Sequence, residues 1–349
     1  MRGARQSHGS KRPELVPATG THHRMNVGYS LMNFSRQSGR LISASMRERL
    51  ASWRELLDLC GRKATRKRVH ALRVVTLRIQ AELERDLADL PRASHQAQAI
   101  LRFGKQAEKL RRALGPVREL DAWIGKLQGL RASLTETGDY VPRSIYDCIS
   151  GIDRLEDRLK QKRRTAEKKL VAEIEKRGGH LGRASEDAEG ALSEFVFGEE
   201  AGIGEELAAR FRAVRTEFST FDEGNLHEFR KRIKTVRYLA EIHAGADRAC
   251  AQIAMQMKKV QSAIGEWHDW QALAHEIRRG HHGKSKALTE LLDTVAAESF
   301  GTAVSTVHSI SARIPGEGTT QAEDLRVEGR KLPVRGDLAL VTDLNKKLA

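Results

Sequence analysis

Two basic segments of this chain repeat the same pattern, with their histidines 157 residues apart. The sequence Val-His-Ala-Leu-Arg-Val at 69–74 is echoed by Leu-His-Glu-Phe-Arg-Lys at 226–231, and further cations follow each copy at helical spacing. Such repetition indicates a duplicated helical unit, because neighbouring copies bury the apolar faces that one copy cannot bury alone. The sequence therefore predicts an all-α protein made of two pseudo-symmetric helical bundles.

The cations of the second copy form a stripe on one side of the predicted helix. At i, i+3, i+7 and i+10, within an arc of about 80°, stand His227, Arg230, Lys234 and Arg237. The neighbouring arc is apolar and holds Leu226, Phe229, Ile233, Val236 and Leu239. Cations concentrated beside a core-facing stripe need an anion, so the pattern predicts an anion-binding face. The alternative is the solvated face of an ordinary helix.

The composition of the 349 residues agrees with a helical protein that binds anions. Only 7 residues are Pro and 5% are aromatic, and segments typical of strands are hard to find. The 61 Lys and Arg residues outnumber the 46 Asp and Glu residues, which gives a formal net charge of +15. Such a surface attracts nucleic acid, anionic membrane or polyphosphate, and the sign of the charge alone leaves all three open.

Cysteine usage and hydropathy indicate a soluble intracellular protein. Cys60, Cys148 and Cys250 are scattered without a CxxC pair, which argues against a disulfide framework and against a thiolate zinc site. No run of 18 apolar residues is present, and the N-terminus has no apolar core of a secretory signal. We therefore expect a cytoplasmic protein without a membrane span.

Glycine, proline and polar stretches divide the chain into five parts. We predict a disordered basic arm at 1–40, a first helical half at 41–178, a linker at 179–199, a second helical half at 200–312 and a loose tail at 313–349. Breaks at Gly115-Pro116, Gly178-Gly179 and Gly265 separate several helices. The expected helices are 41–60, 63–90, 94–113, 117–136, 142–177, 200–218, 222–243, 247–264, 266–281 and 284–312.

A second pair of similar segments follows the basic segments. Residues 109–115 read Lys-Leu-Arg-Arg-Ala-Leu-Gly and align with Lys-Val-Gln-Ser-Ala-Ile-Gly at 259–265. The dipeptide Arg-Glu at 118–119 then aligns with His-Asp at 268–269. We interpret each dipeptide as a local ion pair that orients the basic helices, with direct contact to the anion as the alternative.

These four motifs resemble those of the CHAD family, the conserved-histidine α-helical domain. The second basic segment matches nearly all of the family's pattern, from Leu226-His227 to Arg237-Tyr238, and both glycine turns resemble its L-G-x-x-[RH]-D. The resemblance covers about residues 45–312. The first half departs from the pattern, because Leu77 and Gln80 replace usual cations and Glu119 replaces Asp. We therefore expect the second half to contribute more to binding.

The resemblance implies two bundles about a pseudo-twofold axis, with the basic helices lining a central channel or groove. It also implies binding of inorganic polyphosphate and, in bacteria, association with polyphosphate granules. Arg presents a planar fork of donors to phosphate oxygens, and Lys acts as a point charge. The predicted polyphosphate-binding residues are His70, Arg73, Arg78, Lys109, Arg111, His227, Arg230, Lys234, Arg237, Lys258 and Lys259. The predicted supporting residues are Arg118, Glu119, Tyr238, His268 and Asp269.

The sequence favours a binding module over an enzyme, with no cofactor. No nucleophile with an orienting base and no Gly-rich phosphate loop is evident. His281-His282 and His243 have no acidic or thiolate partner at ligand spacing, so we expect no metal. Trp267 and Trp270, at i and i+3, are expected in the core.

A nucleic-acid-binding protein is the first alternative, although few aromatics are available for base stacking. A phosphohydrolase acting on polyphosphate is the second.

Overall fold

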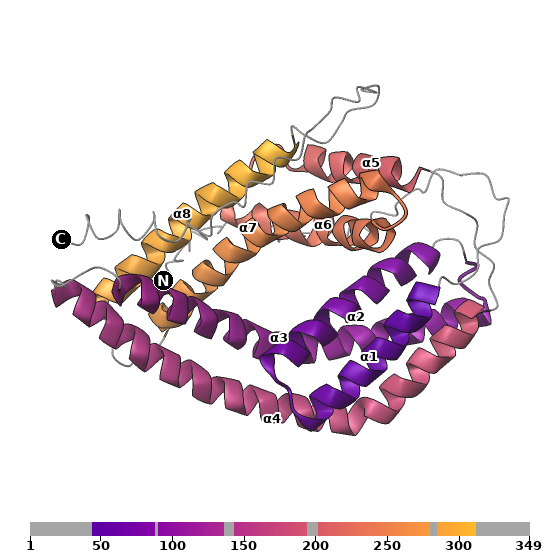
Figure 1. Ribbon diagram of the computed structural model, residues 1–349, viewed down its shortest axis with the longest axis horizontal. Helices are drawn as coiled ribbons and strands as arrows, with labels where there is room; N and C mark the ends of the chain where they lie inside the picture. The colour runs from indigo at the N-terminus through magenta and orange to yellow at the C-terminus, as the bar shows by residue number, and fades with distance from the viewer. Residues whose placement is uncertain (1–43, 88–89, 136–142, 194–201, 280–284, 312–349) are drawn as a thin grey trace, which may run out of the picture. The chain divides into compact units, whose positions relative to one another are not determined.

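A computed structural model of the chain describes residues 44–87, 90–135, 143–193, 202–279 and 285–311. These residues form eight α-helices and no strand, which confirms the all-α prediction (Figure 1). All of them belong to one compact unit that spans residues 37–349. The predicted arm at 1–40 and tail at 313–349 lie outside the described residues. The helices are α1 (Ala44–Arg62), α2 (Arg66–Asp86), α3 (His95–Thr135), α4 (Arg143–Ser193), α5 (Ile203–Glu217), α6 (Glu223–His243), α7 (Arg248–Arg279) and α8 (Lys286–Ser311).

The two basic helices, α2 and α6, each begin at a side-chain cap. Thr65 precedes α2, and its hydroxyl accepts a hydrogen bond from the Arg68 backbone N–H at 3.4 Å. Asp222 precedes α6 and forms a capping box with Asn225, with distances of 2.7 and 2.9 Å. Such caps satisfy the open donors of the first turn and fix where a helix starts. The helix predicted from Asp222 to His243 is confirmed.

The predicted break at Gly115-Pro116 is wrong, because α3 continues through it from His95 to Thr135. Pro116 has no backbone N–H and removes one helical hydrogen bond, at a cost of about 3 kcal/mol. Leu114 and Val117 on either side are fully buried. Burial of each such side chain contributes about 1.5 to 3 kcal/mol. Packing against the core therefore outweighs the local preference for a break.

The predicted break at Gly265 is also wrong, because α7 is continuous from Arg248 to Arg279. A glycine inside a helix costs about 1 kcal/mol relative to alanine. Ile264 and Trp267 beside it are buried, and their packing offsets that cost. Gly265 is itself buried, so its missing side chain leaves room for a neighbour.

The helix predicted to end at Gly178-Gly179 also continues, since α4 extends to Ser193. Residues 179–193, which we expected in a linker, are therefore helical. Leu181, Ala188 and Leu192 prolong the apolar face of α4 at helical spacing and are buried in the same core as α1. Residues 194–199, the rest of the predicted linker, lie outside the described residues.

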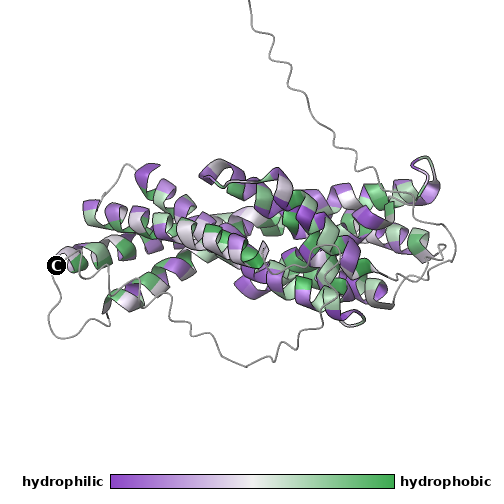
Figure 2. Cartoon of the chain, turned by 90° about the horizontal axis from the view of Figure 1, so that it is seen from above, coloured by the Kyte–Doolittle hydropathy of each residue, from purple (hydrophilic) through white to green (hydrophobic). Residues whose placement is uncertain are grey.

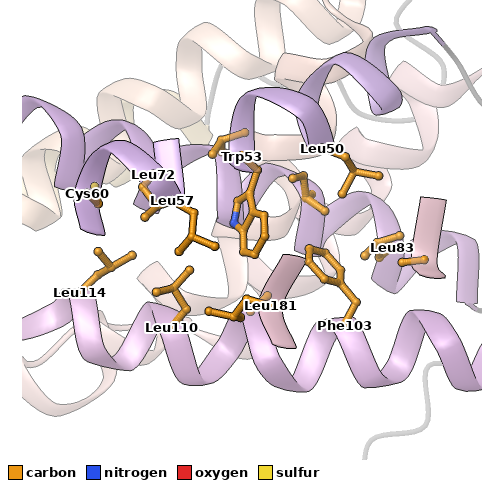
Figure 3. Packing of buried hydrophobic residues seen from close by; sticks show 14 of the residues in the cluster. Leu50, Trp53, Leu57, Cys60, Leu72, Leu83, Phe103, Leu110, Leu114 and Leu181 are labelled. Carbon is orange, nitrogen blue, oxygen red and sulfur yellow. The ribbon is translucent and has the colours of Figure 1, made fainter. Parts of the chain in front are cut away.

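Buried apolar residues form three cores, and hydrophobic residues alternate with hydrophilic residues along the helices (Figure 2). The first core joins α1, α2, the start of α3 and the end of α4. In it Trp53 packs edge-to-face on Phe103, with 5.2 Å between ring centroids (Figure 3). The second core joins α5, α6, the start of α7 and the end of α8. The third joins the end of α3, the start of α4, the end of α7 and the start of α8.

Helices from the two predicted halves pack on one another. α2 contacts α6, and α3 contacts α7. Ala81 of α2 is buried in the second core, among side chains of α6 and α7. These contacts place the two basic helices next to each other, with α3 and α7 alongside. In the part of the chain that the structure describes, no helix is both long enough and apolar enough to cross a bilayer.

Candidate functional site

Five cations from three helices act on one another and form what we call the cation cluster: Arg73 of α2, Arg111 and Arg118 of α3, and Arg230 and Lys234 of α6. The charges of Arg111, Arg118 and Arg230 all act on Arg73. All four arginines act on Lys234. Residues far apart in the sequence are thus close enough for their charges to act on one another.

The cation cluster is partly sheltered from water, which makes its positive charges costly. Burial, and next the charge of Arg230, together lower the pKa of Lys234 to about 7. Burial and the charge of Arg118 lower the pKa of Arg73 to about 10, and the same two causes lower the pKa of Arg230. Desolvation and like charges both disfavour the charged form of a base. An approaching anion therefore lowers the free energy of the cluster.

Several donors in and around the cation cluster have no partner. Nε of Arg230, Nε of Arg111 and Nδ1 of His227 are buried without a hydrogen bond in the described part of the chain. The ammonium of Lys234 likewise makes no hydrogen bond or ion pair with any described residue. Buried polar groups are normally satisfied, so the open N–H donors of Arg230 and Arg111 can accommodate an acceptor, while Nδ1 of His227 can donate or accept.

Gly265 provides the space in which Arg230 lies. A Cβ atom on Gly265 would stand 3.2 Å from Nη2 of Arg230, closer than most side-chain contacts. The guanidinium of Arg230 therefore packs directly over the backbone of α7. The glycine that we expected to break the helix instead lets α7 approach the cation cluster.

Two histidines, His70 and His227, border the cation cluster, and both have lowered pKa values. The ring of His227 stacks on that of His268, with 4.8 Å between centroids. Burial, and next the charges of His268 and Lys231, together lower the pKa of His227 to about 4. His227 is therefore neutral at pH 7 and can both donate and accept a hydrogen bond. Partial burial, and next the charge of Arg118, lower the pKa of the exposed His70.

Asp269 provides a carboxylate at one edge of the cation cluster. It accepts hydrogen bonds from Nη1 and Nη2 of Arg118 at 3.1 and 3.3 Å, and Nδ1 of His268 lies 3.8 Å away. Burial favours its neutral form, but His268 and Arg118 outweigh burial and lower the pKa of Asp269. The expected local pair of Arg118 with Glu119 is wrong, because the carboxylate that binds Arg118 belongs to another helix. Glu119 has a pKa raised by burial.

Glu241 of α6 holds two of the predicted binding residues at another edge. It accepts hydrogen bonds from Nε and Nη2 of Arg78 at 3.0 and 2.8 Å, and from Nε of Arg237 at 2.8 Å. Nη1 of Arg237 also donates to Oε1 of Gln261 at 2.9 Å. Arg78 and Arg237 are thus already paired within the protein. Sequence reasoning missed Glu241 and Gln261, although Glu241 follows Arg237 by one helical turn.

Three predicted binding residues lie at the surface outside this arrangement. Lys109 is exposed, about 200° round α3 from Arg111. Lys258 is exposed on α7, about one turn before Gln261. Lys259 lines a groove of about 620 Å³ between α7 and α8, together with none of the other predicted site residues. Lys109 and Lys259 each lie about 200° round their helix from Arg111 and Gln261, respectively. Lys258 shares the helix face of Gln261 but is exposed to solvent.

A smaller groove, of about 420 Å³, lies between α1 and α2. His70 and Arg78 line it together with Arg49, whose guanidinium pairs with the buried Glu82. Neither groove contains Arg73, Arg111, Arg118, Arg230 or Lys234, so the cation cluster is separate from both.

The aromatic residues near the site are buried. Trp267 and Trp270 have exposed fractions of 1% and 8%, which confirms their prediction as core residues. Tyr238 is also buried, and its hydroxyl makes no hydrogen bond within the described part of the chain. Its steadying role therefore stays a prediction.

The described residues contain no group of three or more His, Cys, Asp or Glu side chains that could hold a metal ion. His243 instead lies 3.0 Å from the guanidinium of Arg85, measured at Nε2. His281-His282 falls outside the described residues.

Comparisons with known proteins agree with this fold. The family model of the CHAD domain matches residues 44–278, more than half of the chain, so the protein belongs to the CHAD family. Among solved structures, PptA from Streptomyces chartreusis is similar in fold, with a TM-score of 0.51 and 14% sequence identity. That similarity covers 77% of this chain and 95% of PptA. No curated protein sequence matches this chain.

We predict that Asp269→Asn destabilises the protein, because Arg118 loses its counter-charge while the cation cluster gains one net positive charge. Arg118 is partly exposed, so we expect the free energy of unfolding to fall by about 1 to 3 kcal/mol at low salt. Screening at higher ionic strength should recover part of the loss. Urea unfolding at about 0.05 and 0.5 M salt measures both effects.

Asp153→Asn is the matched control. It breaks the pair between Asp153 and Arg131, 2.9 Å apart, in which both side chains are 49% exposed. Exposed pairs contribute little, so its cost should stay below about 0.5 kcal/mol and should change little with salt. Equal losses in the two variants would contradict the role that we assign to Asp269.

Proposed function

We propose that this protein binds inorganic polyphosphate at the cation cluster. The observation that carries the proposal is that Arg230 and Lys234 are crowded by like charges and have no hydrogen-bond acceptor among the described residues. Both lie among other cations in partial shelter, with donors that no described residue satisfies. An anion in contact with them would remove the repulsion and satisfy the donors, and its binding would stabilise the folded protein by linkage.

The types of residue in the cation cluster suit a chain of phosphates. Arg donates two parallel hydrogen bonds to phosphate oxygens, and Lys adds a compact charge. A linear polyphosphate presents charge along its length and no base to recognise. The buried Trp267, Trp270 and Tyr238 offer no platform on which a base could stack. The site therefore favours polyphosphate over single-stranded nucleic acid.

The proposal includes a pseudo-twofold arrangement in which α2 and α6 line a shared channel or groove. Two observations support it. Each basic helix begins at a cap five residues before its histidine, Thr65 before His70 and Asp222 before His227. Near the contact of α3 with α7, Arg118 bonds to Asp269, while the charge of His268 acts on Glu119. Aligned residues thus interact crosswise, as related halves would.

We propose that the protein binds polyphosphate without cleaving it, and that binding brings it to polyphosphate granules. The carboxylates near the cation cluster support a binding role, because Asp269 and Glu241 are engaged by arginines. Incubation with long-chain polyphosphate and a divalent metal tests this point directly. Release of orthophosphate above a protein-free control would favour a phosphohydrolase.

Competition between polyanions tests the proposed ligand. Long-chain polyphosphate should displace duplex DNA and RNA from the protein at about 0.15 M salt, compared at equal phosphate concentration. Displacement of polyphosphate by either nucleic acid would instead favour the alternative of a nucleic-acid-binding protein.

The double variant Arg230→Ala/Lys234→Ala should lose polyphosphate affinity by about 100-fold, because two direct phosphate contacts disappear. The slope of log Kd against log salt should fall by about 1.4. Removal of like charges should leave the fold at least as stable as wild type. Fluorescence anisotropy with labelled polyphosphate measures affinity, and circular dichroism checks the fold.

The matched control is Lys109→Ala/Lys259→Ala, which removes the same charge from exposed positions. Its affinity should stay within about threefold of wild type, since general attraction to a polyanion is screened at moderate salt. Similar losses in the two double variants would show that net charge, and not the cation cluster, binds the ligand.

We predict that polyphosphate affinity falls as the pH rises above 7. The pKa of Lys234 is about 7 without ligand, and an adjacent polyanion raises it, so binding takes up a proton. Below pH 7 Lys234 is already charged, and affinity should change little through this group. Above pH 7 the Kd should rise by up to about tenfold per pH unit.

Lys234→Arg tests the origin of this dependence, because a guanidinium keeps its charge across the range. The variant should bind with a nearly flat profile between about pH 7 and 9. Calorimetry in buffers of different ionisation enthalpy should show proton uptake for wild type and little for the variant. A variant that retains the wild-type slope would assign the pH dependence to another group.

A further inference from the structure

Arg66, at the start of α2, lies against a glycine of α3. A Cβ atom on Gly125 would stand 3.1 Å from both Nη1 and Nη2 of Arg66. The guanidinium therefore packs over the backbone of α3 in the way that the guanidinium of Arg230 packs over Gly265 of α7. Arg66 is exposed and makes no hydrogen bond or ion pair with any described residue. The position of its guanidinium is thus fixed by α3, but no described carboxylate neutralises its charge.

Arg66 continues the line of cations that leads out of the cation cluster. Arg66, His70 and Arg73 stand at i, i+4 and i+7 on α2, so they share one helix face. The charges of Arg66, Arg73 and Arg118 all act on His70. His70 thus lies between the cation cluster and Arg66, which is about 10 Å from Arg73 along the helix axis.

We propose that Arg66, seated on Gly125, is a further polyphosphate-binding residue that engages phosphates of the chain beyond those held by the cation cluster. The inference rests on the proposed function. A polymer whose middle is bound by Arg73 and Arg230 must leave the sheltered region in some direction. The face of α2 that carries His70 and Arg66 offers it positive charge, and packing against α3 lowers the entropy that Arg66 loses on binding.

Arg66→Ala should weaken binding of long-chain polyphosphate about fivefold at about 0.15 M salt. The salt slope should fall by about 0.7, the value of one lost phosphate contact. Lys67→Ala is the matched control, because it removes the same charge from the exposed neighbour about 100° round the helix. Lys67→Ala should leave both quantities close to wild type. Equal effects of the two variants would overturn the proposal.

Gly125→Leu tests the seat without any change in charge. A leucine side chain fills the space of the guanidinium and displaces Arg66, so affinity should fall as in Arg66→Ala. Gly129→Leu, on the same helix with no atom within 4 Å of its Cβ position, should bind like wild type. The double variant Arg66→Ala/Gly125→Leu should bind no more weakly than Arg66→Ala, because each change removes the same contact between Arg66 and phosphate. Fully additive losses of affinity would contradict the claim that packing against Gly125 positions Arg66.

These measurements separate the inference from the proposed function. A wild-type protein that ignores long-chain polyphosphate would overturn both. The inference alone would be overturned if Arg230→Ala/Lys234→Ala strongly weakens binding but Arg66→Ala weakens it no more than Lys67→Ala does.

Discussion

The site depends on keeping like charges close together in the absence of a ligand. Arg73, Arg230 and Lys234 repel one another in partial shelter, where water screens them weakly. The apolar cores supply the free energy that offsets this repulsion, because their buried side chains fix α2, α3, α6 and α7 in place. Folding thus brings positive charges together before any anion is bound.

Two groups of cations in and around the site differ in their partners. Arg118, Arg78 and Arg237 are tied to Asp269 and Glu241, and these ties connect α3 with α7 and α2 with α6. Arg230 and Lys234 have no such ties to described residues. The first group holds the helices in place while the second remains available. A site built only of unpaired cations would be less stable without a ligand. A site built only of ion-paired cations would have few donors free to bind one.

Sequence patterns predicted the all-α class and the basic helix that is α6, because helical periodicity is a local property. They could not predict that α3 and α7 continue through Pro116 and Gly265, since burial of distant partners decides this. Periodicity also could not separate Arg111 from Lys109, or find Arg66 on Gly125, because both depend on which face meets a neighbouring helix. Glu241 was missed because its partner Arg78 lies in another segment.

The continuity of α4 has a consequence for how this protein can be divided. Its first turns belong to the third core and its last turns to the first core, so this one helix contributes side chains to both. Severing the chain near residue 179 would strip Leu181, Ala188 and Leu192 from the fragment that needs them. Each fragment would then expose apolar surface and be prone to aggregate. The sequence halves are therefore not autonomous modules, and co-expressed pieces would have to reassemble before either could work.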